Sequence, residues 1–183
     1  MVILRPTRKL HTFLKPSGSP MADSDTALGD WYVNRVVVDR QPLLLLVSSA
    51  SLVPVIVPAR DVRALPDRLA SLVAARLRRL GLPPAIIDAE RGAMTAVSIG
   101  PTVDRSVLGI MVDFGKAISF HLEPGLWSED TLPMVEDRLA ETPCFASQPS
   151  DRVVFPNKKG PELLMTKWLA NMPLQPTSGR AVH

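Results

Sequence analysis

The first third of the chain alternates short apolar runs with turn residues, a pattern typical of β-strands. Residues 2–4 predict a short strand, and residues 31–38 predict a second because they are rich in aromatic and β-branched side chains. Residues 43–47 are fully apolar, as in a central strand, and residues 52–57 follow after another short turn. Because these turns are short, we expect the last three strands to form an antiparallel meander.

The third strand of this meander carries two prolines, Pro54 and Pro58. Proline has no backbone N–H group and therefore cannot donate a hydrogen bond to a neighbouring strand. We expect this strand to lie at an edge of the sheet or to be bulged.

From residue 62 onward, apolar residues recur every three or four positions, which predicts helices. Val62, Leu69 and Leu77 belong to the apolar face of a helix over residues 62–80, which Gly81 ends. Asp104 is expected to cap a longer helix that reaches Leu122. The other predicted elements are a short turn or helix at residues 8–14 with Pro6 at its first position, a helix at 83–92, a strand at 96–99, and helices at 132–140 and 161–170.

Together these elements predict an α+β domain, with an antiparallel sheet of four or five strands packed against several helices. We expect residues 1–171 to form one domain with a mobile polar loop at residues 16–27, and residues 172–183 to form a disordered tail. No apolar run reaches the roughly 18 residues that a membrane-spanning helix needs, so we expect a soluble protein with no membrane partner.

Known catalytic and metal-binding motifs are absent from the sequence. The three histidines, His11, His121 and His183, are widely separated, so we expect no metal site and no cofactor. The single cysteine, Cys144, stands between proline and phenylalanine with no local base, which favours a packed thiol over a reactive one. One unpaired cysteine also fits a reducing cytoplasm. There is no glycine-rich phosphate loop.

Charge is unevenly distributed along the chain. Residues 1–80 carry 12 Lys/Arg and 6 Asp/Glu, whereas residues 81–183 carry 9 and 12. The outer face of the predicted helix over residues 62–80 holds five arginines: Arg63, Arg68, Arg76, Arg78 and Arg79. Arg63, Arg68, Arg76 and Arg79 are therefore candidate phosphate contacts, and nucleic acid is a candidate partner. The alternative is a solvated basic surface whose last-turn arginines complement the helix dipole.

One polar segment, residues 28–34, places a Trp, the only Tyr and an Asn at the start of a strand. Such side chains line pockets, but they also close one end of a hydrophobic core, and both interpretations stay open. If the segment forms a pocket, Trp31 would flank it. The polar groups that we expect to converge there are Asp30, Asn34, Asp39, Arg40, Arg105, Ser106 and Asp113. The structural alternative is that Ser106 caps its helix and that Arg105 and Asp113 orient it.

Several segments together resemble a bacterial family known as domain of unknown function 6933. The segments are residues 3–15, Leu28-Gly29-Asp30-Trp31-Tyr32-Val33-Asn34, Arg105-Ser106-Val107-Leu108-Gly109 with Met111 and Asp113-Phe114, and Arg138-Leu139 with Glu141-Thr142-Pro143. The resemblance covers about residues 2–165 and implies no activity. Two features depart from the family pattern, because the loop at residues 16–27 is longer and Val112 replaces a polar residue. The tail at residues 173–179 resembles the ends of proteins encoded on mobile gene cassettes, where defence and toxin–antitoxin roles are common.

Three functional hypotheses follow. The first is a non-enzymatic binding or regulatory module with a protein partner, because no catalytic constellation is visible. The second is an enzyme or small-ligand binder with a pocket near Trp31, Asn34, Arg105 and Asp113. The third is nucleic-acid contact through the arginine face of the helix over residues 62–80.

Overall fold

The computed structural model describes residues 1–16, 22–145 and 153–170. The predicted tail and residues 17–21 of the predicted loop lie outside these ranges. The elements in chain order are β1 (Val2–Pro6), β2 (Trp31–Val38), β3 (Gln41–Ser48), β4 (Pro54–Pro58), α1 (Leu65–Arg79), α2 (Pro84–Ala93), β5 (Val97–Ile99), α3 (Arg105–His121), α4 (Leu132–Ala140) and α5 (Pro156–Ala170). Short 3₁₀ turns cover Arg8–Leu10, Val62–Ala64 and Glu129–Thr131.

The five strands form one sheet in the order β4-β3-β2-β1-β5. The α+β class and the antiparallel meander β2-β3-β4 are confirmed, but the sheet is mixed, not antiparallel. β1 runs parallel to both β2 and β5. Parallel neighbours need long connections, and residues 7–30 separate β1 from β2 along the chain. The β2–β3 hairpin turns at Asp39 and Arg40, which both adopt positive φ angles, 49° and 64°.

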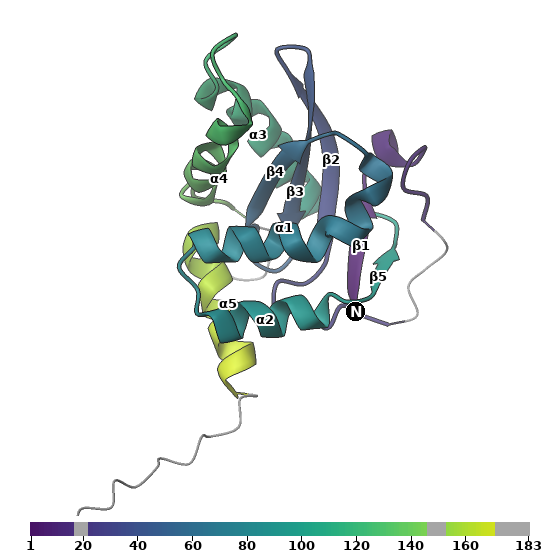
Figure 1. Cartoon of the computed structure of the whole chain (residues 1–183), viewed down its shortest axis with the longest axis vertical. Coiled ribbons are helices and arrows are strands. Elements are labelled where there is room, and N and C mark those ends of the chain that lie inside the picture. Colours follow the sequence, from purple (N-terminus) through teal and green to yellow (C-terminus); the bar gives the residue numbers. More distant parts are fainter. Residues whose placement is uncertain (17–21, 146–152, 171–183) are drawn as a thin grey trace, which may run out of the picture.

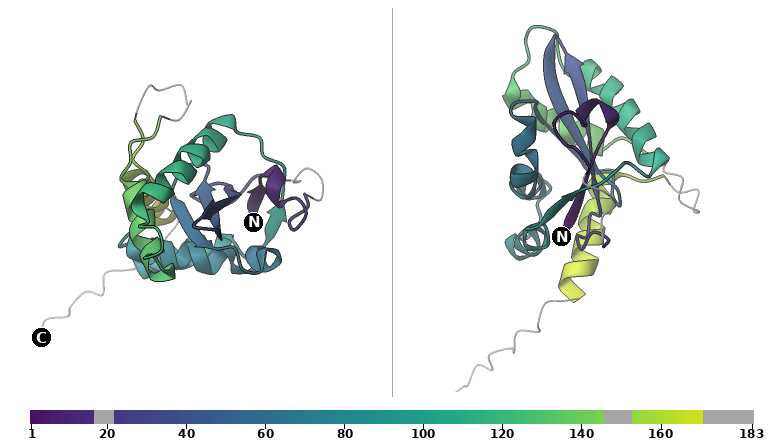
Figure 2. Two further views of the ribbon diagram at one scale, coloured as in Figure 1. Left: turned by 90° about the horizontal axis from the view of Figure 1, so that it is seen from above. Right: turned by 90° about the vertical axis from the view of Figure 1, so that its right-hand side faces the viewer.

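Helices cover both faces of the sheet (Figure 1). In the right-hand view of Figure 2, α1 and α2 lie on one face of the sheet and α3 lies on the other. Two apolar clusters correspond to these faces: Trp31, Val33 and Leu46 pack with α1, α2 and α5, whereas Tyr32 and Leu45 pack with α3 and α4. The alternation of side chains along each strand explains the division, because successive residues point to opposite faces.

The outer edge of β4 offers no free backbone donor. The bonds Ala59 N to Pro42 O and Ser48 N to Val53 O set the register, so that positions 54, 56 and 58 point away from β3. Two of these positions are prolines, as the sequence predicted for an edge strand. The third, Ile56, donates its N–H to Glu136 Oε1 of α4 at 2.7 Å. The edge is therefore blocked against pairing with another strand.

The same glutamate connects α4 to α1 through a charge network whose inner members, Arg76 and Glu136, are buried. Arg76 is fully buried, pairs with the Asp137 carboxylate and donates to the Glu136 carbonyl at 3.2 Å. Arg79 pairs with the Glu136 carboxylate. Buried charges are tolerated only when they are paired, so these contacts fix the spacing of α1 and α4 around the β4 edge.

A second buried carboxylate, Glu90 of α2, holds the segment that precedes β2. It accepts hydrogen bonds from the backbone N–H groups of Ala27 and Leu28 at 2.9 and 3.1 Å. It also accepts one from Trp168 Nε1 of α5 at 2.7 Å. Burial raises the pKa of Glu90, and the three donors partly oppose that rise.

Two local predictions were wrong. Pro6 is the last residue of β1 and does not start a helix, because Thr7 N still bonds to Val33 O of β2. α5 begins at Pro156, five residues before the predicted start, so residues 156–160 are also helical. Pro156 is the first residue of α5, a position where proline is favoured, and Gly160 lies so close to Val53 that an added Cβ would be 2.7 Å from the Val53 Cγ2 atom.

We predict that Arg76→Met lowers the free energy of unfolding by about 3–5 kcal/mol, because it leaves the buried Glu136 carbonyl without its donor and the Asp137 carboxylate without its cation. Adding Glu136→Gln should recover part of the loss, since glutamine still accepts from Ile56 N. Urea denaturation measures the stability of the single and the double variant. Arg78→Met is the control, because Arg78 is exposed on the same helix. An equal loss in the control, or a double variant worse than the sum of its single variants, would contradict the network.

We predict that Glu90 gives stability a specific pH dependence. Because the pKa is raised in the folded state, folded protein binds the proton more tightly. The contribution of Glu90 therefore favours folding at low pH and declines as pH rises from the ordinary glutamate pKa to the raised one. Glu90→Gln should remove this decline, because glutamine does not titrate. The variant should also lose about 1–3 kcal/mol of unfolding free energy, because the glutamine NH₂ group is a donor that faces backbone N–H donors. Urea denaturation of both proteins from pH 4 to 8 tests this prediction. If the free energy of unfolding of wild type, relative to that of the variant, grew as pH rises, Glu90 would not be the group responsible.

Candidate functional site

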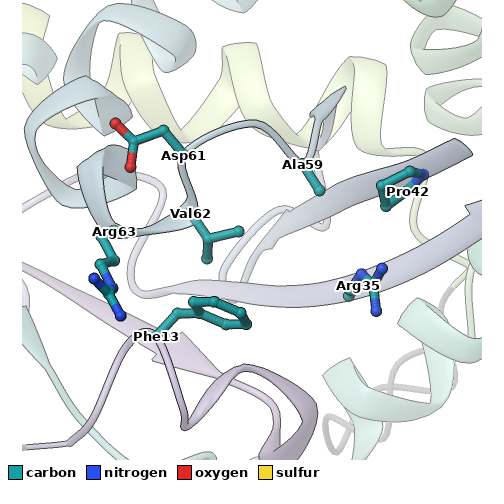
Figure 3. Close-up of a pocket in the computed structure, with 7 residues that line it drawn as sticks. All are labelled: Phe13, Arg35, Pro42, Ala59, Asp61, Val62 and Arg63. Atoms are coloured by element: carbon teal, nitrogen blue, oxygen red, sulfur yellow. The ribbon is translucent and has the colours of Figure 1, made fainter.

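An open pocket of about 400 Å³ lies at the hairpin end of the sheet, on the face that α1 covers. Figure 3 shows its lining residues, which come from five separate segments. They are Phe13, Arg35 of β2, Pro42 of β3, Ala59 after β4, and Asp61, Val62 and Arg63 at the 3₁₀ turn before α1. Four of the seven are apolar and two are arginines, so the lining combines an apolar surface with positive charge.

The pocket exists because α1 begins too late to cover this end of the sheet. β4 ends at Pro58, and the chain then reverses through Asp61, whose φ of 42° and ψ of 65° are left-handed. Aspartate tolerates this conformation better than most residues. Val62 is buried against the sheet, and α1 starts only at Leu65. The protruding part of the β2–β3 hairpin therefore has no helix over this face.

Strand register places Arg35 and Pro42, the two strand residues of the lining, diagonally across the same face of the hairpin. Val37 is opposite Pro42 and Arg35 is opposite Leu44, so Arg35, Val37 and Pro42 share the uncovered face. Val37 is 56% exposed and Phe13 is 46% exposed, although both are large apolar residues. The apolar surface of the pocket thus continues along the hairpin.

The charges at the pocket are mostly positive. Within the described ranges, neither Arg35 nor Arg63 makes an ion pair. In Figure 3 the two arginines flank the Phe13 ring, while the Asp61 carboxylate points away from it. The neighbouring Arg60 forms an ion pair with the Glu129 carboxylate. Two guanidinium groups beside an exposed ring can bind a carboxylate or phosphate together with an apolar group.

The residues expected to form a pocket with Trp31 do not converge. Trp31 is fully buried beneath α1, α2 and α5, whereas α3, which carries Arg105 and Asp113, lies on the opposite face. Asp113 is exposed and sits 4.0 Å from Lys116. Arg105 is exposed at the first position of α3. The core interpretation of Trp31 is therefore the one that its position supports.

The other predicted site residues have structural partners. Asp30 pairs with Arg5 of β1 and accepts a hydrogen bond from Ser24. Asn34 accepts one from Thr7 at 2.8 Å, which joins β2 to the end of β1.

Asp39 and Arg40 form the hairpin turn. The Asp39 carboxylate accepts from Trp127 Nε1 at 2.8 Å and from Gly125 N at 3.1 Å, and Arg40 is exposed. Ser106 lies in the first turn of α3, but the cap is Asp104, which accepts from Ser106 N at 2.7 Å. These contacts position the hairpin and α3.

The predicted arginine face is only partly a surface. Arg68 is exposed on α1 and Arg63 lines the pocket. Arg76, expected on the outer face, is fully buried because α4 packs there, and Arg79, which is exposed, is paired with Glu136. Two of the four candidate phosphate contacts, Arg76 and Arg79, therefore form ion pairs with α4.

Cys144 is buried, as its sequence setting predicted. Burial, together with the nearby Asp113 carboxylate, raises the pKa of the Cys144 thiol to about 11. The group is a neutral thiol at neutral pH and a poor nucleophile. Among the described residues, no group of three His, Cys, Asp or Glu side chains could hold a metal ion.

Sequence reasoning missed Phe13 and Arg35. Phe13 was assigned to an amphipathic turn, but Leu10 and Leu14 are the residues of that turn that enter the core. Arg35 did give a signal, since it interrupts the valines of β2 at a position on the same face as buried Val33. A charged residue there indicates that the helical layer does not reach that end of the strand.

A family model matches most of the chain. The family model described as Domain of unknown function (DUF6933) matches residues 3–159. No curated protein and no solved structure matches the chain. None of the described helices is long and apolar enough to cross a membrane.

Proposed function

The chain belongs to the domain of unknown function 6933 family, and we propose that it is a non-enzymatic binding module. In this proposal the pocket at Phe13 holds an acidic, partly apolar segment of a partner protein. The observation that carries it is the exposed Phe13 ring between two arginines, beside an uncovered strand face.

The composition of this surface supports a protein partner. Exposed aromatic residues and arginines are enriched at protein interfaces, whereas a monomer's surface seldom leaves adjoining large apolar side chains in water. Phe13 and Val37 would bury their exposed area against an apolar residue of the partner. Arg35 and Arg63 would bind carboxylates on either side of that residue.

The same surface is less suited to nucleic acid. Single strands are usually held by successive stacked bases along a basic groove, and this pocket offers one aromatic ring. The arginine face of α1 is also reduced, since Arg76 and Arg79 are engaged by α4. A cytoplasmic location is part of the proposal, because Cys144, a lone buried thiol, needs no oxidising compartment.

We predict that an acetylated, amidated peptide of sequence Asp-Glu-Leu-Asp-Glu binds the protein and that added salt weakens the binding. Arg35→Gln and Arg63→Gln should each weaken it about 5–10-fold, the effect of losing one charge-assisted hydrogen bond. Phe13→Ala should weaken it by a similar factor through lost apolar contact. Isothermal titration calorimetry at low and moderate salt measures these changes.

Arg68→Gln is the matched control, because it removes one exposed positive charge from α1 outside the pocket. It should leave binding within twofold of wild type. A peptide with lysines in place of its acidic residues should not bind. Equal losses in the control and pocket variants would show attraction to overall charge and contradict the proposal, as would the absence of binding at millimolar peptide.

A further inference from the structure

The outer edge of β5 differs from the blocked edge of β4. Within the described ranges, β1 is the only strand paired with β5. The bonds Val2 N to Ala96 O and Gly100 N to Leu4 O show that positions 96, 98 and 100 face β1. Alternation along the strand then turns the backbone groups of Val97 and Ile99 outward. Neither residue is proline, and neither N–H has an acceptor among the described residues.

A pocket of about 560 Å³ adjoins this edge, between α1, α2 and the start of β5. Val97 is part of its lining, so the pocket reaches the strand itself. The charged residues in the lining are Asp67 of α1 and Asp88 and Arg91 of α2, and Met94 supplies an apolar wall. The two aspartates are exposed and make no ion pair with a described residue, which leaves the pocket with a net negative charge.

We infer that this edge binds an extended segment of a partner protein that carries a lysine or arginine. The segment adds a strand beside β5, exchanging backbone hydrogen bonds with Val97 and Ile99. Its basic side chain enters the adjoining pocket and meets the carboxylates of Asp67 and Asp88. This surface shares no lining residue with the Phe13 pocket and takes a partner of opposite charge, so the inference goes beyond the proposed function.

Three residues make a short edge, and brevity alone discourages pairing. Two or three backbone bonds give little affinity by themselves, each contributing about 0.5–1.5 kcal/mol. The pocket provides the second contribution and the specificity, because only a segment with a correctly spaced cation gains from both. The strand edge and the pocket therefore act as one site.

The experiment titrates ¹⁵N-labelled protein with an acetylated, amidated Thr-Val-Lys-Val-Thr peptide. We expect millimolar or tighter binding, and at least fivefold slower hydrogen exchange of the Val97 and Ile99 amides in the complex. Asp67→Asn and Asp88→Asn should each weaken binding about 3–5-fold, whereas Asp130→Asn, an exposed acid elsewhere, should not. A peptide with N-methylated backbone amides should bind at least fivefold more weakly.

Three results would overturn the inference. The first is no binding at 10 mM peptide, on the order of the weakest specific affinity considered. The second is binding that leaves exchange at Val97 and Ile99 unchanged, or that Asp130→Asn weakens as much as the pocket variants do. The third is amide protection that rises with protein concentration without peptide, which would assign the edge to a second copy of the chain.

Discussion

The carboxylate of Glu136 is the contact on which the arrangement of the layers depends. One oxygen accepts from Ile56 N, the only N–H group that points outward from β4, and the other binds Arg79, while the adjacent Asp137 binds buried Arg76. Edge strand, α1 and α4 are thus held by one group of charges around the margin of the sheet. An isolated buried carboxylate would be strongly unfavourable, so the two helices can pack only where their charges meet.

This constraint has a consequence for the binding surface. With α1 fixed over the middle of β3 and β4, the hairpin end of β2 and β3 extends beyond the helix (Figure 1). On the other face, Asp39 ties the same hairpin to Trp127 and Gly125, so the protruding end is supported from behind. The Phe13 pocket therefore lies on a rigid, half-covered strand pair, which suits a surface that binds without rearranging.

Much of the fold could be predicted from local signals. The strand at 31–38, the edge character of the strand between Pro54 and Pro58, and the Asp104 cap all follow from residue type and spacing. The parallel pairing of β1 could not, because nothing local distinguishes a parallel from an antiparallel neighbour. α5 begins five residues before the predicted start, and its Gly160 packs closely on Val53, a contact between residues far apart in sequence that local signals do not show. The candidate site was missed for the same reason: Arg63 was identified as a charge, but Phe13 and Arg35 join it only in the fold.

The most direct test of the account is where an acidic peptide binds. Chemical-shift mapping with the Asp-Glu-Leu-Asp-Glu peptide on ¹⁵N-labelled protein locates the contact without any substitution. We predict the largest amide shifts at Phe13, Arg35, Val62 and Arg63, with little change on α3. Shifts centred on exposed Arg68 and Arg78 of α1, or spread evenly over the basic residues, would show that the Phe13 pocket is not the binding site.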